Sequence, residues 1–176
     1  MMWGVAAVLV IGVLAIEALL ERRAAYARAY VKASEEFYAA AQALIHKSAV
    51  SDAMIDFVTF MNGIMADKRT AKAMYYVVRN NASSLANDGK EPDWEKFIGD
   101  KTITAEERWL IISLLRKTVG VWFTAILNRS PFYGRLLLLK MAECLADNGA
   151  VEPVLRVSRH WQCSHGRKRS GHAMAA

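Results

Sequence analysis

The first apolar stretch of the chain runs from residue 2 to residue 20 and contains a single charge, Glu17. Its 19 residues, as a helix, measure about 28 Å, close to the hydrocarbon core of about 30 Å. The stretch is almost continuously apolar rather than amphipathic, which favours a membrane span. Trp3 stands at one end, as interfacial aromatic residues often do. The sequence therefore predicts a transmembrane anchor over residues 1–20.

Two other interpretations of this stretch stay open: a cleaved signal peptide and a core helix of a soluble protein. A signal peptide is disfavoured because no Lys or Arg precedes the apolar run. The one A-x-A-like site, residues 25–27, follows a charged cluster rather than the apolar run. A soluble core helix is disfavoured because the apolar positions do not follow a helical stripe.

Cations follow the apolar stretch, namely Arg22, Arg23, Arg28 and Lys32. The positive-inside rule then predicts an N-terminus outside and a body in the cytoplasm. In the opposite orientation the body would face a periplasm-like space. We expect Arg22 and Arg23 to face lipid headgroups.

A single long helix is predicted from the anchor to about His46, because no Gly or Pro occurs from residue 13 to residue 51. Within it a seam recurs at steps of four and three, as in a heptad: Tyr26, Tyr30, Ala33, Phe37, Ala40 and Leu44. The seam packs either on the chain's own body, which we favour, or on a second copy in a homodimer. The anchor itself has no GxxxG motif for dimerisation.

The next helix is predicted from Asp52 to Met65, with apolar residues at relative positions 0, 3, 4, 7, 10 and 11. Its apolar side carries Met54, Met61 and Met65. Methionine is common on adaptable binding surfaces, so these three residues are candidates for binding a protein partner. The alternative is ordinary core packing, which explains most apolar stripes.

Further helices are expected from about Arg69 to Leu85 and, after a loop over 87–93, from Trp94 to Ile98. Thr104 and Glu107 form a capping box, which marks the start of a helix that runs to about Leu127.

A last helix is predicted over 131–147, with Ser130 as N-cap and Pro131 at its first position. Because the connection is so short, we expect it to form an antiparallel pair with the helix before it. Its four leucines, 136–139, would be buried in that pair.

No strand pattern of any length interrupts these helices, so the predicted class is all-α. We expect a transmembrane anchor (1–20), a juxtamembrane helix (21–50), a bundle of about five helices (51–150) and a basic, disordered tail (151–176).

The net charge of +6 changes this picture little, because most of it comes from the end of the chain. The last acidic residue is Glu152. Five cations follow it, Arg156, Arg159, Arg167, Lys168 and Arg169, so residues 1–152 carry only +1. We expect Arg167, Lys168 and Arg169 to lie against anionic lipid together with Arg22 and Arg23. Nucleic acid is a weaker interpretation, since basic and aromatic residues are not interleaved on a folded face. A soluble nucleic-acid-binding helical protein stays open as one alternative.

Four potential metal ligands stand in the tail: His160, Cys163, His165 and His172. Zinc accepts such ligands, but the spacing matches no standard finger, and Arg167 to Arg169 would repel a cation. These residues are weak candidates, and no metal site is predicted.

Motifs with a known catalytic mechanism are not found: the sequence has no P-loop, dinucleotide fingerprint, HExxH or nucleophile elbow. No cofactor is therefore expected. A small membrane-associated enzyme that uses His46 or the tail histidines stays open as an alternative.

Arg116 and Lys117 lie in the middle of an otherwise apolar helix. Each would cost about 2.5–3.5 kcal/mol at the centre of a membrane span, so residues 109–127 are predicted to form a core helix instead. We interpret the two cations as lining a groove for an acidic partner, with a salt bridge to Glu143 or another acid, or solvent exposure, as alternatives. Taken together, the patterns favour a membrane-tethered helical scaffold or adaptor.

Overall fold

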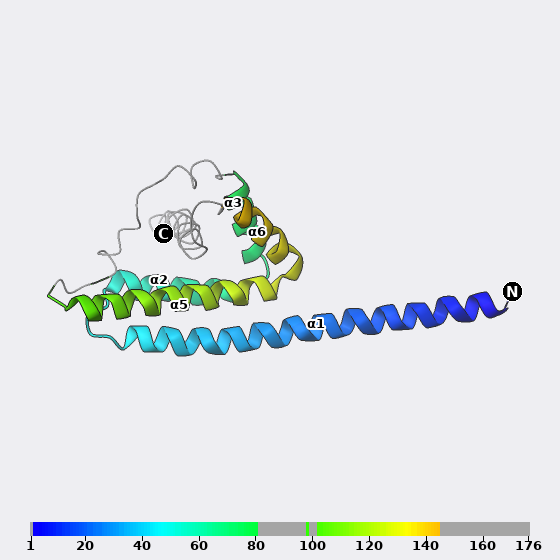
Figure 1. Ribbon diagram of the computed structural model, residues 1–176, viewed down its shortest axis with the longest axis horizontal. Helices are drawn as coiled ribbons and strands as arrows, with labels where there is room; N and C mark the ends of the chain where they lie inside the picture. The colour runs from blue at the N-terminus through cyan, green and yellow to red at the C-terminus, as the bar shows by residue number, and fades with distance from the viewer. Residues whose placement is uncertain (1, 81–97, 99–101, 145–176) are drawn as a thin grey trace, which may run out of the picture.

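The computed structural model describes residues 2–80, 98 and 102–144, and this part of the chain is helical throughout apart from short connections. Its helices are α1 (Met2–Ile45), α2 (Asp52–Met65), α3 (Thr70–Asn80), α5 (Ala105–Arg129) and α6 (Pro131–Cys144). The predicted all-α class is confirmed, and no strand occurs among these residues. Figure 1 shows the other helices on one side of the second half of α1, with α5 lying along it, while the first half of α1 projects beyond them.

The long first helix is continuous from Met2 to Ile45, as its uninterrupted run of helix-forming residues predicts. The second half of α1 runs antiparallel to α5 and packs along it (Figure 1). The predicted seam provides the contact, since Ala33, Phe37, Ala40 and Leu44 are buried. The seam therefore packs on the chain's own body, and a dimer through the same face would have to displace α5.

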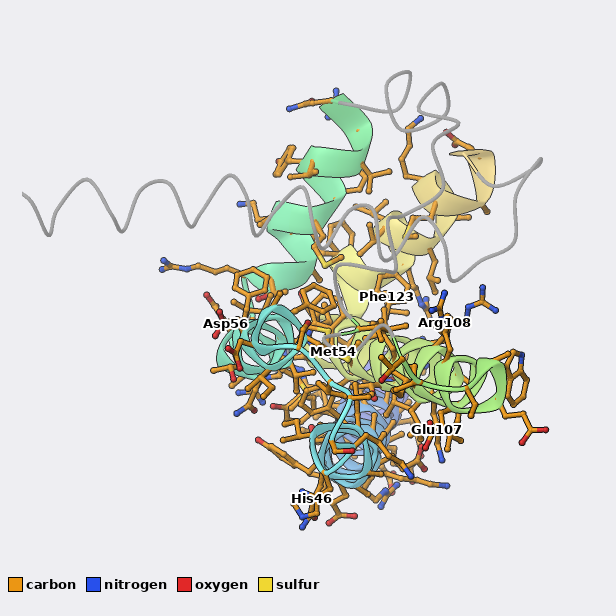
Figure 2. All side chains as sticks on the ribbon, turned by 90° about the vertical axis from the view of Figure 1, so that its left-hand side faces the viewer. His46, Met54, Asp56, Glu107, Arg108 and Phe123 are labelled. Carbon is orange, nitrogen blue, oxygen red and sulfur yellow. The ribbon has the colours of Figure 1, made fainter. Side chains whose placement is uncertain are left out.

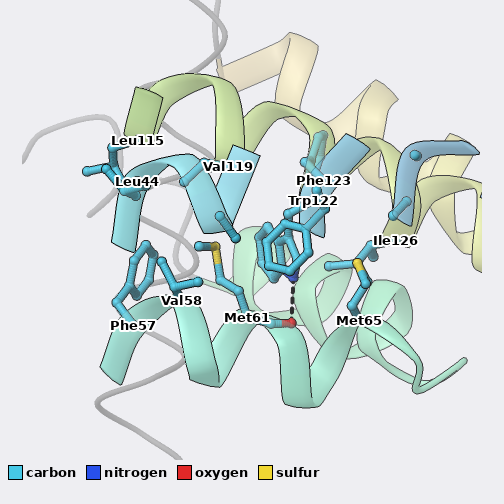
Figure 3. Close-up of a cluster of buried hydrophobic side chains, with 14 of the residues drawn as sticks. Leu44, Phe57, Val58, Met61, Met65, Leu115, Val119, Trp122, Phe123 and Ile126 are labelled. Atoms are coloured by element: carbon cyan, nitrogen blue, oxygen red, sulfur yellow. Dashed lines mark hydrogen bonds between the residues drawn. The ribbon is translucent and has the colours of Figure 1, made fainter. Parts of the chain in front are cut away.

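Helix α2 begins and ends at the predicted residues. Its N-cap Ser51 accepts a hydrogen bond from the backbone N–H of Met54 at 3.4 Å, which satisfies one of the free donors of the first turn. The apolar side is buried as a stripe: Met54, Phe57, Val58, Met61 and Met65. This side faces α5 and the end of α1 (Figure 3).

A tight turn joins α2 to α3. The Asp67 carboxylate accepts a hydrogen bond from the backbone N–H of Arg69 at 2.8 Å. The hydroxyl of Thr70, although buried, donates to the carbonyl of Ile64 at 2.6 Å, so its polar group is satisfied. Helix α3 starts one residue later than predicted. The rest of its predicted range and most of the predicted short helix 94–98 lie outside the described residues; Ile98 itself forms an isolated bridge with Val50.

Helix α5 is the centre of the body and contacts each of the other helices. Its start is the predicted capping box: the Thr104 hydroxyl accepts from the Glu107 N–H at 3.2 Å, and the Glu107 carboxylate accepts from the Thr104 N–H at 3.4 Å. The buried residues of α5 are Ile111, Leu115, Thr118, Val119, Trp122, Phe123, Ala125 and Ile126. They face α1 on one side and α2 on the other (Figure 3).

One buried polar contact joins α5 to α2. The indole N–H of Trp122 donates to the backbone carbonyl of Met61 at 2.9 Å (Figure 3). Trp122 is fully buried, so this bond satisfies the only polar atom that its side chain brings into the core. The contact fixes the register between the two helices.

The arrangement of α6 differs from the expected antiparallel pair. Only Ser130 separates α5 from α6, and the chain turns there so that α6 runs across the axis of α5 and packs mainly on α3 (Figure 1). A single linking residue is too short for the chain to reverse its direction, which an antiparallel pair would require. The predicted burial of the four leucines is correspondingly wrong: Leu137 is buried, whereas Leu138 and Leu139 are exposed.

Gly134 makes the sharp turn between α5 and α6 possible. A Cβ at this position would lie 2.5 Å from the carbonyl oxygen of Leu127 and 2.9 Å from its Cα. The backbones of the two helices are thus in direct contact at this point. The N–H of Gly134 also donates to the Ser130 carbonyl at 2.7 Å, which is the first intrahelical bond of α6.

Candidate functional site

The most unusual surface of the described chain is the projecting first half of α1. Its large apolar side chains over residues 11–20 are 58–66% exposed: Ile11, Val13, Leu14, Ile16, Leu19 and Leu20. At 100° per residue these positions surround the helix rather than forming one stripe. A helix that is apolar on all sides needs an apolar environment on all sides, because water penalises each exposed face.

Apart from Glu17, charged residues begin where this apolar surface ends. Glu21, Arg22 and Arg23 are exposed, and Arg28 follows about one turn and a half later. The predicted lipid-facing residues Arg22 and Arg23 are therefore solvent-accessible and close to the apolar segment. The other predicted lipid-facing residues, Arg167, Lys168 and Arg169, lie outside the described residues.

The three methionines that were candidates for partner binding lie in the core. Met54, Met61 and Met65 are all at most 2% exposed, and α5 covers them (Figure 3). Figure 2 shows Met54 directed into the body. The structure therefore favours core packing for these residues, and in this conformation a partner would not reach them.

Arg116 and Lys117 are exposed in the middle of α5, on the side away from the core. Glu143 forms a salt bridge with Lys140 of its own helix. Within the described side chains, α5 is long and apolar enough to cross a membrane. Its packing on α1 and α2 gives it the position of a core helix in this body.

A shallow depression of about 460 Å³ lies at the start of α5. We call it the Trp109 surface, and it is lined by Ile103, Ala105, Arg108, Trp109 and Ile112. Trp109 is 71% exposed. Arg116 follows Trp109 by seven residues and so lies on the same side of the helix.

The Trp109 surface was not predicted from the sequence, and the reason is physical. Apolar residues surround α5 almost completely, so their spacing does not show which of them face the neighbouring helices. No spacing signal marks the surface; the structure shows that Trp109 precedes the first buried residue of α5, Ile111.

Acidic and histidine side chains do not converge on one site in the described part of the chain. Figure 2 shows His46 and Asp56 directed outward on different sides of the body, and Glu107 is occupied in the capping box. No group of three or more His, Cys, Asp or Glu residues able to hold a metal ion occurs among the described residues. The candidate ligands His160, Cys163, His165 and His172 lie outside them.

Comparisons with known proteins add no family or relative. The chain matches no protein-family model, and neither the curated proteins nor the solved structures contain a significant match.

Proposed function

We propose that this chain is a membrane-tethered helical adaptor whose body binds a protein partner. The observation that carries the proposal is the projecting segment of α1, whose apolar side chains are exposed on all sides. A partner helix would cover one side of such a segment, whereas hydrocarbon covers every side. Lipid is therefore the environment that best fits this surface.

Length and flanking charge support the tether. Residues 2–20 measure about 28 Å as a helix, close to the hydrocarbon thickness of about 30 Å. Trp3 and the Arg22–Arg23 pair stand at opposite ends of this segment, where interfacial anchors are usual. The excess of cations after the segment supports an orientation with the N-terminus outside and the body in the cytoplasm.

Insertion into a bilayer is tested with two matched double variants of the full chain. Ile11→Arg with Leu14→Arg places two charges within the proposed span, at a cost of about 5–7 kcal/mol. Val31→Arg with Tyr38→Arg adds the same charges at exposed positions of α1 beyond it. We expect only the first variant to lose resistance to carbonate extraction. Equal extraction of both variants would refute the tether.

Orientation is tested separately by protease access to sealed vesicles. With the body in the cytoplasm, protease added to the cytoplasmic side removes the body, and protease added to the opposite side leaves it intact. The reverse result would place the body on the other side of the membrane and would leave the span itself standing.

The partner surface we propose is the Trp109 surface. An exposed indole beside a depression is typical of the aromatic anchors that dominate protein interfaces. Arg108 lines the depression, and Arg116 and Lys117 continue the same part of α5 with positive charge. The surface therefore fits an amphipathic segment that offers apolar side chains together with carboxylates.

Synthetic amphipathic peptides with one apolar spacing and either Glu or Lys at the polar positions test this surface. We expect the Glu peptide to bind the full chain in micelles, and Trp109→Ala to weaken binding about tenfold or more. Phe132→Ala is the matched control, because Phe132 is 70% exposed on another helix. Equal binding of the Lys peptide, or equal loss in the control, would contradict the proposed surface.

A further inference from the structure

The outer side of α6 is a second exposed apolar surface. Phe132 and Leu139 are 70% and 64% exposed, and a spacing of seven residues puts them on one side of the helix. Gly134, Leu137 and Met141 are buried on the opposite side, which packs on the rest of the body. We call the outer side, with Phe132, Arg135, Leu136 and Leu139, the α6 stripe.

A hydrogen bond locates the α6 stripe relative to the apolar segment of α1. The guanidinium of Arg135 donates to the hydroxyl of Tyr26 at 2.9 Å. Tyr26 follows Leu20 by six residues, so this contact lies about 9 Å along the helix axis beyond the end of the segment. The headgroup layer on each side of a bilayer is itself about 5–7 Å thick. The start of α6 is thus next to the level of the headgroups.

The direction of α6 also suits a bilayer surface. Figure 1 shows α6 at the end of the body from which α1 projects, running across the long axis of α1. A membrane crossed by α1 would lie broadly along α6 instead of meeting it end on. Interfacial helices adopt this position, with apolar side chains at the boundary between headgroups and acyl chains.

The charges around the α6 stripe are mainly positive. Arg22, Arg23 and Arg28 of α1 and Arg135 of α6 are exposed in this region, together with two acidic residues of α1, Glu17 and Glu21. Further along α6, Glu143 is paired with Lys140. Exposed aromatic and aliphatic side chains beside several cations are the combination that anionic lipid surfaces bind.

We propose that the α6 stripe rests on the membrane leaflet through which α1 enters the body's compartment. Phe132 and Leu139 then contact the headgroup layer, and Arg135 faces anionic headgroups. This inference rests on the proposed tether and adds a second contact to it. The two contacts together hold the body in one orientation against the bilayer.

Depth-dependent quenching tests the contact in the full chain reconstituted into vesicles. Both native cysteines, Cys144 and Cys163, are replaced by Ser, and one new cysteine carries an environment-sensitive fluorophore. The sites are Leu19→Cys in the proposed span, Phe132→Cys on the α6 stripe and Trp109→Cys as a control with the same exposure as Phe132. Circular dichroism verifies that each labelled chain is folded.

Lipids that carry a quencher at headgroup or acyl depth then report the position of each label. We expect quenching by both the acyl-chain and the headgroup quenchers at residue 19, which lies near the end of the proposed span, shallow quenching by the headgroup quencher alone at residue 132, and none at residue 109. We also expect the shallow quenching at residue 132 to be stronger in vesicles with anionic lipid than in zwitterionic ones. Each cation that contacts the headgroups should raise the ratio of docked to undocked body by roughly fivefold.

Three other results would overturn the inference, and they are distinguishable. Quenching at residue 19 with none at residue 132 leaves the tether intact and removes the α6 contact. Equal quenching at residues 132 and 109 means that the body contacts lipid without a preferred side. No quenching at residue 19 refutes the tether and the inference together.

Discussion

The contact between the backbones of α5 and α6 gives a sharp test of the fold. In Gly134→Ala the new methyl group would lie 2.5 Å from the Leu127 oxygen and 2.9 Å from the Leu127 Cα. Neither atom belongs to a side chain that can rotate away. The helices must therefore separate by several tenths of an ångström or more.

The expected magnitude combines two effects of opposite sign. Forcing an extra carbon into a packed contact costs typically about 1–3 kcal/mol. The preference of a helix for Ala over Gly offsets about 0.5–1 kcal/mol of this cost. We therefore expect Gly134→Ala to lower the free energy of unfolding by about 1–2 kcal/mol.

Gly120→Ala in the middle of α5 is the matched control, because a Cβ there would meet nothing within 4 Å. This variant should gain about 0.5–1 kcal/mol. Thermal denaturation of the full chain in micelles, followed by circular dichroism, should separate the two variants by roughly 4–8 °C. Equal stability of the two, or a more stable Gly134→Ala, would refute the close approach of α5 and α6.

Three further substitutions test other contacts, each by denaturation of the full chain. Trp122→Phe removes the buried bond to the Met61 carbonyl and leaves unfilled space, so we expect a loss of about 2 kcal/mol; a neutral result would mean that this bond does not form. Thr104→Ala should cost about 1 kcal/mol through the lost N-cap, and no cost would argue against the capping box. Arg129→Gln removes a guanidinium 4.8 Å from the centre of the Tyr30 ring, and we expect a loss of about 0.5–1 kcal/mol that Arg129→Lys only partly restores.

Local sequence signals predicted the helices well where one side alone is apolar. The stripe from Met54 to Met65 defined α2 to the residue, and the Thr104–Glu107 pair identified the start of α5. The seam of α1 was also identified, and two interpretations of it followed. Periodicity shows which side of a helix is buried, but it does not show whether the chain itself or a second copy covers that side.

Tertiary arrangement was less predictable where several sides of a helix are apolar. The run of leucines at 136–139 looked buried throughout, yet only one side of α6 reaches α3, so Leu138 and Leu139 remain outside. Trp109 likewise belongs to a helix with apolar residues on most sides, and its spacing does not show that it is exposed. The direction of α6 depends on a glycine that lets two backbones touch, and no spacing pattern records such a contact.

The continuity of α1 has a consequence for what the body can reach. In a tethered chain, α1 from Leu20 to Ile45 would act as a stiff post of about 38 Å, with no Gly or Pro to serve as a swivel. The start of α5, with Trp109, lies beside the far end of that post (Figure 1). A membrane-bound partner would therefore need a cytoplasmic arm of about 11 extended residues to arrive there. Partners with shorter cytoplasmic segments would not reach Trp109, so the length of this rigid part of α1 would select among membrane-bound partners.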